Sequence, residues 1–221
     1  MPHSAPPLAQ PDLFARPSQA AAITIAPEVV ILKRHAVTPP LVAAIGRVSR
    51  AAPFRRLYTR GGGQMSVAMT NCGAVGWHSD THGYRYVDRD PESGRPWPTM
   101  PPAFLSLATR AAALAGFPGF EPDCCLVNRY AIGTQMGAHR DFDELDMRHP
   151  IVSVSIGLPA VFLWYGATRK GPALPVCVED GDVVVWGGTA RAGYHGVRRV
   201  AAPAGVVPGA VRYNLTFRRA R

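Results

Sequence analysis

Two histidines and one aspartate in this sequence have the types and spacing to hold a redox-active metal. His139 and Asp141 are two positions apart, so on an extended segment both side chains project to the same face. His195, within Gly193-Tyr194-His195-Gly196, is the candidate for a second histidine ligand. Two histidines and one carboxylate on one side of Fe(II) leave positions open for a chelating co-substrate and O2. His149 is a competing candidate, because an H-x-D pair is common by chance.

The segment near the C-terminus offers positive charge for an acidic co-substrate. As a strand, residues 211–218 would place four polar side chains on one face, namely Arg212, Asn214, Thr216 and Arg218. An arginine binds a carboxylate through two parallel hydrogen bonds, so two arginines can hold both ends of a dicarboxylate such as 2-oxoglutarate. Further donors are expected at Asn128, Tyr130 and Ser153. The alternative is an amphipathic strand whose polar face lies in solvent.

Many short strands and turns are expected to position these groups. Glycine and proline each occur 22 times among 221 residues, and 47% of the chain is hydrophobic, which is enough for a core. Runs rich in β-branched and aromatic residues predict strands at 29–32, 65–72, 124–130, 151–156, 160–164, 175–179, 182–186 and 210–217. Apolar spacing predicts helices at about 40–48 and 103–115. Asp180-Gly181 predicts a hairpin, and three glycines at 61–63 predict a turn.

The order of these elements predicts a mainly β fold with an α/β N-terminal part. The strands after about residue 121 are expected to form an eight-stranded double-sheet jelly roll. The region of Trp77, Tyr84 and Tyr86 is expected to be a polar loop. Residues 1–20 are rich in proline and are interpreted as a mobile arm, with 21–221 as a single domain.

Net charge and cysteine spacing narrow the choice of partners. The formal net charge of +9 at pH 7 favours a polyanion such as nucleic acid, although a solvated Arg-rich surface gives the same excess. The arginines at 47–60 are either a phosphate-binding face or a solvated one. The four cysteines form no C-x-x-C pair, so we expect no zinc site and interpret them as buried small hydrophobes. With no secretory signal and no spanning apolar run, we expect a cytoplasmic location and no membrane partner.

Several motifs, taken together, resemble one enzyme family in order and spacing. They are 65–73 (MSVAMTNCG), Gly76-Trp77, 95–98 (RPWP), Asn128-Arg129-Tyr130, His139-Arg140-Asp141, 150–155 (PIVSVS), 157–160 (GLPA), 181–188 (GDVVVWGG), Tyr194-His195-Gly196 and 212–218 (RYNLTFR). On these residues the chain resembles the AlkB family of Fe(II)- and 2-oxoglutarate-dependent dioxygenases, from about residue 12 to 219. The resemblance is more specific than any one motif.

The resemblance implies a fold and a set of metal and co-substrate residues. The family fold is a double-stranded β-helix, here a jelly-roll core at about 121–221, with a nucleotide-recognition lid at about 50–95. The implied Fe(II) ligands are His139, Asp141 and His195. The implied 2-oxoglutarate contacts are Asn128, Tyr130, Ser153, Arg212, Asn214 and Arg218. In the family, the later arginine binds the carboxylate far from iron, which would be Arg218 here.

The resemblance also implies a substrate pocket. Trp77 and Tyr84 match lid aromatics beside a flipped base, while Met69, Asp143 and Arg169 match other pocket positions. Stacking on an aromatic face contributes about 1–3 kcal/mol per base, although ordinary packing is the commoner fate of an aromatic. The chain departs from the best-known bacterial pattern beside the site, at 135–137, Arg140 and Trp164-Tyr165. These departures leave the strand preference and the lesion range open.

The expected function is oxidative repair of alkylated DNA. The substrates would be N1-methyladenine and N3-methylcytosine in single-stranded DNA, with RNA as a further substrate. O2 and 2-oxoglutarate would be consumed, and succinate, CO2 and formaldehyde released, by an enzyme that we expect to be a monomer. Two alternatives are a dioxygenase of the same fold acting on a small molecule or a protein, and a non-catalytic nucleic-acid-binding module. The second is disfavoured because all three ligand types and both arginines are present.

Overall fold

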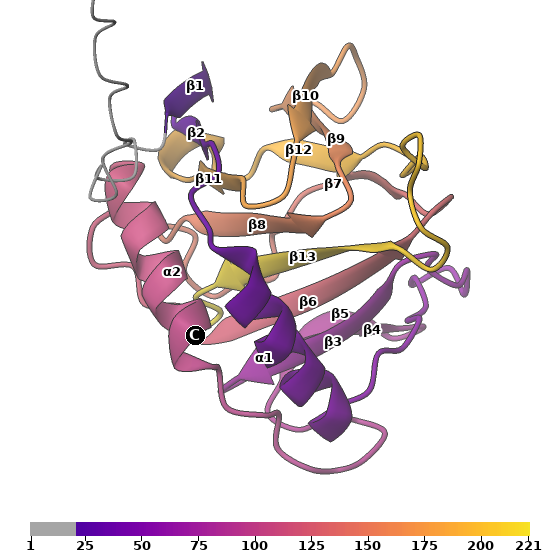
Figure 1. Ribbon diagram of the computed structural model, residues 1–221. Coiled ribbons are helices and arrows are strands. Elements are labelled where there is room, and N and C mark those ends of the chain that lie inside the picture. The colour runs from indigo at the N-terminus through magenta and orange to yellow at the C-terminus, as the bar shows by residue number, and fades with distance from the viewer. Residues whose placement is uncertain (1–20) are drawn as a thin grey trace, which may run out of the picture.

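Two antiparallel sheets and a separate hairpin make up most of the computed structural model, which describes residues 21–221 (Figure 1). The arm expected at residues 1–20 lies outside the described residues. The large sheet has the strand order β1-β2-β11-β8-β13-β6-β3, the small sheet β10-β9-β12-β7, and the hairpin β4-β5. The strands are β1 (Ala22–Ala26), β2 (Val29–Leu32), β3 (Ala68–Gly73), β4 (Gly76–Asp80), β5 (Gly83–Val87), β6 (Cys124–Ala131), β7 (Met136–His139), β8 (Ile151–Gly157), β9 (Ala160–Gly166), β10 (Leu174–Val178), β11 (Val183–Trp186), β12 (Tyr194–Val197) and β13 (Val211–Arg218). The helices are α1 (Thr38–Ala51), α2 (Pro102–Leu114) and the short 3-10 helix η1 (Gly188–Ala190).

The strands from β6 onward form the predicted jelly roll. Four of them, β6, β8, β11 and β13, lie in the large sheet, and the other four, β7, β9, β10 and β12, form the small sheet. The chain passes from one sheet to the other several times, so residues far apart in sequence face each other across the space between the sheets. The mainly β fold class with an α/β N-terminal part is confirmed.

The predicted hairpin at Asp180-Gly181 is wrong. β10 pairs with β9 in the small sheet, whereas β11 pairs with β2 and β8 in the large sheet. The turn therefore carries the chain between sheets, and its polar groups bond to other elements. The backbone N–H of Gly181 donates to the carbonyl of Ser155 (2.9 Å), and Asp180 Oδ1 accepts from the N–H of Gly157 (2.7 Å). These tertiary bonds replace the local ladder of a hairpin.

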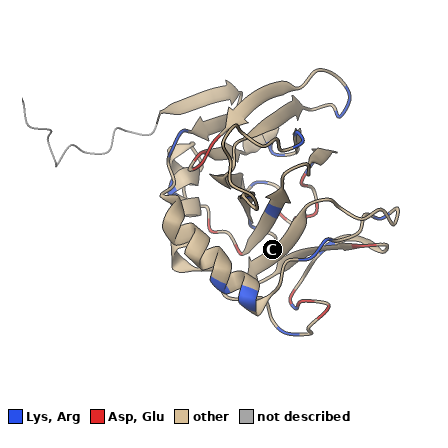
Figure 2. Ribbon diagram, turned by 45° about the vertical axis from the view of Figure 1, so that its right-hand side comes forward, with Lys and Arg blue, Asp and Glu red and all other residues tan. Residues whose placement is uncertain are grey.

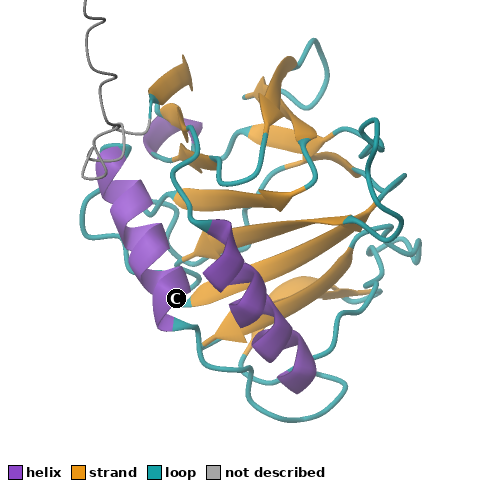
Figure 3. Ribbon diagram, viewed as in Figure 1, coloured by secondary structure: helices purple, strands orange, loops and turns teal. Residues whose placement is uncertain are grey.

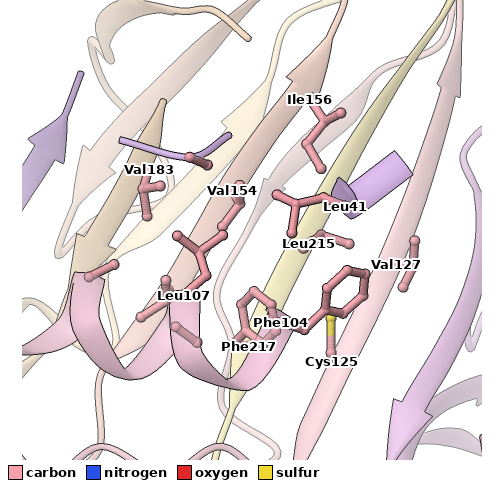
Figure 4. Close-up of a cluster of buried hydrophobic side chains, with 14 of the residues drawn as sticks. Leu41, Phe104, Leu107, Cys125, Val127, Val154, Ile156, Val183, Leu215 and Phe217 are labelled. Atoms are coloured by element: carbon pink, nitrogen blue, oxygen red, sulfur yellow. The ribbon is translucent and has the colours of Figure 1, made fainter. Parts of the chain in front are cut away.

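Both long helices cover the outer face of the large sheet (Figure 3). Pro39 and Pro40 lie in the first turn of α1, where no N–H partner is needed, so the helix begins before the predicted position 40. The core beneath the helices is apolar, and Phe104 of α2 meets Phe217 of β13 edge to face, with ring centroids 6.0 Å apart (Figure 4). The opposite face of β13 is the polar one, and it points toward the small sheet.

The region around Trp77 is a two-stranded hairpin and not the predicted polar loop. β4 and β5 pair in register, with Trp77 opposite Tyr86, and the turn passes through Gly83 at φ +114°. Arg85 braces the turn end of the hairpin by donating to both carboxylate oxygens of Asp80, at 2.9 and 2.7 Å. The predicted turn at 61–63 is confirmed, because the N–H of Thr59 bonds to the carbonyl of Gly63.

Three cysteines are buried as interpreted, and one is not. Cys72, Cys124 and Cys125 are buried in or beside the core, whereas Cys177 on β10 is exposed. The interpretation is therefore wrong for Cys177, which lies on an edge strand of the small sheet. None of the helices described at 21–221 is long and apolar enough to span a membrane.

Candidate active site

His139, Asp141 and His195 converge on one point between the two sheets. His139 ends β7 and His195 lies in β12, and the two residues are direct partners in that antiparallel pair. Asp141 follows β7 by two residues, and one potential ligand atom from each residue lies within 4.8 Å of the others. Among residues 21–221 this is the one cluster of its kind, and the competing candidate His149 is not part of it.

Backbone carbonyls orient both imidazoles for metal binding. His139 Nδ1 lies 2.9 Å from the carbonyl oxygen of Gly137, and His195 Nδ1 lies 3.1 Å from that of Gly193. A carbonyl oxygen can only accept, so Nδ1 carries the proton in both rings and Nε2 keeps its lone pair for a metal. Both histidines sit in a Gly-x-His sequence. This repeated pattern is a further sequence signal for the two ligands, in addition to the H-x-D spacing.

The protonation states suit a cationic ligand. Burial, followed by the nearby charge of His139, lowers the pKa of His195 to about 3, so its imidazole is neutral near pH 7. Burial alone would raise the pKa of Asp141, but the charge of Arg218, then those of the two histidines, hold this pKa well below its usual value. A neutral imidazole and an ionised carboxylate are the forms that bind a divalent metal.

The two arginines of β13 lie in the reverse of the expected order. Arg218 Nη2 is 2.9 Å from Asp141 Oδ2, so Arg218 lies at the metal end of the site. Arg212, six residues earlier on the strand, donates to Ser155 Oγ at 3.1 Å instead. The expectation that Arg218 binds the carboxylate far from iron is therefore wrong for this geometry. Which arginine meets the metal ligand depends on the register of β13 against the loop after β7, which the sequence does not reveal.

The inner face of the large sheet forms a polar floor. β13 pairs with β6 and β8 so that Asn214 lies opposite Asn128 on one side and Ser155 on the other. Asn214 Nδ2 donates to Ser153 Oγ at 2.8 Å, and Thr216 Oγ1 donates to Asn214 Oδ1 at 2.8 Å. Thr216 was expected on this face, although not among the co-substrate contacts, whereas Ser155 was not expected in the site. The signal for Ser155 was alternation, since it lies two positions from Ser153.

Several buried donors on this floor have no partner. Nε and Nη1 of Arg212 and Nη1 of Arg218 are buried and make no hydrogen bond to any group in residues 21–221. Leaving a charged donor buried and unpaired is costly, so these groups are built to receive an anion. Burial also lowers the pKa of Arg212. A dicarboxylate bound between the two guanidinium groups fits this donor set, with its metal-binding end toward Asp141.

All the expected site residues line one cavity of about 340 Å³. Its wall on the lid side is the hairpin, where Trp77 and Tyr84 stack with ring centroids 5.5 Å apart. Trp77 Nε1 donates to Asp143 Oδ2 at 3.0 Å, which joins the hairpin to the loop after the metal ligands. Met69 and Arg169 complete the wall. The structure thus brings the candidate metal, co-substrate and substrate residues to a single space.

The arginines at 47–60 do not form one basic face. Arg55 pairs with Asp90 and Glu92, so its charge is satisfied internally. Arg47 and Arg50 lie on α1, on the side of the large sheet opposite the cavity. Figure 2 shows lysine and arginine dispersed over the ribbon and not gathered on one element. Of the two interpretations of this segment, the solvated face is the better supported for Arg47 and Arg50.

Comparison with known proteins agrees with this chemistry. Residues 29–218 match the model of the 2OG-Fe(II) oxygenase superfamily. Alpha-ketoglutarate-dependent dioxygenase AlkB of Salmonella typhimurium is 50% identical over 198 residues, which cover 89% of this chain and 92% of that protein. DNA N(6)-methyladenine demethylase ALKBH1A of Arabidopsis thaliana is 37% identical over 119 residues, covering 53% of this chain and 34% of that protein. The solved structure of OsALKBH1 aligns with a TM-score of 0.76 at 29% identity, over 90% of this chain and 100% of that one. The chain therefore belongs to the 2OG-Fe(II) oxygenase superfamily and, within it, to the AlkB family of α-ketoglutarate-dependent dioxygenases.

Proposed function

We propose that this enzyme removes alkyl groups from N-alkylated bases in nucleic acid, with N1-methyladenine and N3-methylcytosine as its substrates, in the repair of alkylation damage. The observation that carries the proposal is the shared cavity, in which an aromatic stack and a carboxylate lie beside the metal ligands. A stacking face suits a flipped base, and a carboxylate suits the positive charge of both methylated bases. A relative in Arabidopsis thaliana named as a DNA demethylase supports the same substrate class.

Fe(II) held by His139, Asp141 and His195 would supply the activation of O2, with 2-oxoglutarate as the reductant that ends as succinate and CO2. One oxygen atom of O2 enters the succinate, and the other is inserted into a C–H bond of the N-alkyl group. The resulting N–CH2–OH group loses its hydroxyl proton, and its C–N bond breaks. The electron pair of that bond returns to the base, and formaldehyde is released.

The side chains of this chain position both reactants. Arg212, with its unpartnered buried donors, binds the carboxylate of 2-oxoglutarate far from the metal, and Arg218 holds the metal end. Tyr130 supports the co-substrate from β6, because within residues 21–221 its hydroxyl has only the weak acceptor Met136 Sδ, at 3.7 Å. Trp77 stacks on the base while it holds Asp143 in place through its indole N–H.

Single-stranded DNA is the proposed form of the substrate, with RNA second. A base outside a duplex needs no unpairing before it enters the cavity, so it binds at lower cost. A monomer is the proposed state, because this chain alone supplies every residue of the cavity. Residues 21–221 are proposed as one domain, with the lid at about 50–95 and the jelly-roll core at about 121–221. The cytoplasm is the proposed location, consistent with four free thiols.

A product assay tests the proposal. A single-stranded oligonucleotide with one N3-methylcytosine is incubated with Fe(II), 2-oxoglutarate and O2, and formaldehyde and succinate are measured against His139→Ala as the inactive control. We expect equimolar formaldehyde and restored cytosine, and a rise in the KM for the oligonucleotide of about tenfold in Trp77→Ala, since one stacking contact is worth about 1–3 kcal/mol. The contrary result would be an enzyme that binds metal and slowly converts 2-oxoglutarate to succinate, yet releases no formaldehyde from any alkylated oligonucleotide. That result would reject nucleic acid as the substrate.

A further inference from the structure

Glu144 is a buried carboxylate next to the site that the proposed reaction does not use. Its side chain is 1% exposed, and it does not line the cavity. It accepts a hydrogen bond from Tyr86 Oη at 2.6 Å, and Oε1 lies 3.3 Å from Arg218 Nε. Oε2 lies 3.0 Å from Arg191 Nη2. A carboxylate this deeply buried must be compensated by specific partners.

The groups around Glu144 form a charge-balanced cluster. Two carboxylates, Asp141 and Glu144, face two guanidinium groups, Arg191 and Arg218, and Arg218 contacts both carboxylates. Burial raises the pKa of Tyr86 well above its usual value, so it joins the cluster as a neutral donor. The formal charges of the two carboxylates and the two guanidinium groups therefore cancel.

We propose that Glu144 is a positioning residue for metal binding, which acts on the metal ligand Asp141 through Arg218. Arg218 bonds to Asp141 Oδ2 through both Nη2 (2.9 Å) and Nε (3.2 Å), and so competes with a cation for that carboxylate. Glu144 contacts the same guanidinium group and offsets its positive charge, which weakens the hold of Arg218 on Asp141. Arg191 fixes the loop that carries both carboxylates, since it donates to the backbone carbonyls of Asp141 (2.9 Å) and His149 (2.7 Å). The inference rests on the metal and co-substrate roles proposed above.

This role gives opposite effects on the binding of a cation and of an anion. Glu144→Gln keeps the shape and an acceptor for Tyr86 but makes the cluster one charge more positive. We expect the dissociation constant for Mn(II) to rise by about tenfold or more, and that for 2-oxoglutarate, measured with metal chelated, to fall by a similar factor. Both are measured by calorimetry on the full-length chain without nucleic acid. Because no nucleic acid is present, a negative result would count against the role of Glu144 and not against nucleic acid as the substrate.

Two further variants separate charge from packing. Tyr86→Phe removes the hydrogen bond to Glu144 but leaves the charges unchanged, so we expect Mn(II) affinity to stay within about threefold of the wild type. Glu144→Asp keeps the negative charge but shortens the side chain by one methylene, so it should keep Mn(II) affinity within about threefold of the wild type even if it lowers the Tm. Unchanged Mn(II) affinity in Glu144→Gln, equal weakening in Tyr86→Phe, or parallel loss of Mn(II) and 2-oxoglutarate binding would each overturn the proposal.

Discussion

The imidazoles of this site are oriented by their own strands. Each histidine bonds through Nδ1 to the carbonyl two residues before it, and that residue is a glycine in both cases. At Gly193 a Cβ would lie 2.2 Å from the ring of Trp164, so no larger residue fits there. The ligand geometry is thus set by the backbone.

At the residue scale, the sharpest prediction concerns Arg212. Its unpartnered donors are the ones available for the carboxylate far from the metal, so Arg212→Gln removes a charge-assisted pair of hydrogen bonds. We expect the KM for 2-oxoglutarate to rise about thirtyfold or more, equivalent to about 2 kcal/mol, while Mn(II) affinity stays within a few fold. Steady-state kinetics at varied 2-oxoglutarate measure the effect. Ser155→Ala, which removes only the neutral partner of Arg212, is the matched control and should have a much smaller effect.

The site chemistry could be predicted from residue types, but the arrangement within it could not. The H-x-D pair, the later histidine and the alternating face of β13 all meet at one cavity. The two arginines lie in the opposite order to the expected one, since Arg218 and not Arg212 contacts Asp141. This order depends on how β13 lies against the loop after β7. Glu144 and Arg191 gave no signal, since a loop glutamate and a loop arginine are ordinarily exposed and only the tertiary fold buries them.

At the element scale, both errors in predicting turns and hairpins have the same cause, which is that contacts with distant segments override the local sequence pattern. The turn at 180–182 had the composition of a hairpin, yet its N–H and C=O groups bond to β8 and to the segment before α1. The β4–β5 hairpin had weak alternation, yet it forms because its aromatic face packs against the loop that follows Asp141. Local pattern predicted the apolar strands of the core, but it missed the short strands β1, β7 and β12, which have few apolar residues or lie at a sheet edge.

Asp90 connects the two ends of the segment at about 50–95 and gives an acid-dependent part of the stability. It is 2% exposed, and it pairs with Arg55 and accepts hydrogen bonds from Ser93 and the N–H of Glu92. Burial would raise the pKa of Asp90, but the Arg55 and Ser93 hydrogen bonds outweigh burial and lower it to about 2. A lowered pKa in the folded state means stability that is present above about pH 4 and lost as the pH falls toward 2.

Asp90→Asn should therefore destabilise the protein at pH 7 and flatten its acid response. We expect a loss of about 2 kcal/mol in the free energy of unfolding at pH 7, and a smaller dependence of stability on pH between 4 and 2 than in the wild type. Urea unfolding at several pH values measures both. A variant that keeps the full wild-type slope in that window would show that other carboxyls carry the acid response.

At the scale of the whole molecule, the two faces of the large sheet have different roles: the outer face stabilises the fold, and the inner face carries the residues of the site. Its outer face packs against α1 and α2 through an apolar core, while its inner face carries the polar floor of the cavity. β13 serves both, because Tyr213, Leu215 and Phe217 alternate with the polar residues between them. The jelly roll allows this because the small sheet closes over the inner face and excludes the helices from it.

This separation predicts that a large core cavity leaves the site intact. Phe104 is fully buried in α2 and meets Phe217 edge to face, on the side of β13 away from Arg218. Phe104→Ala should cost about 3–5 kcal/mol of stability, which for a chain of this size lowers the Tm by about 6 to 20 °C. Because the sheet between the two faces is held by β6 and β8 on either side of β13, we expect the KM for 2-oxoglutarate below the Tm to change by less than about threefold. Phe104→Leu, which refills most of the space, should recover much of the Tm. A rise of tenfold or more in that KM while the protein is still folded would contradict this separation. It would mean that a change in packing on the outer face of β13 shifts the site residues on its inner face.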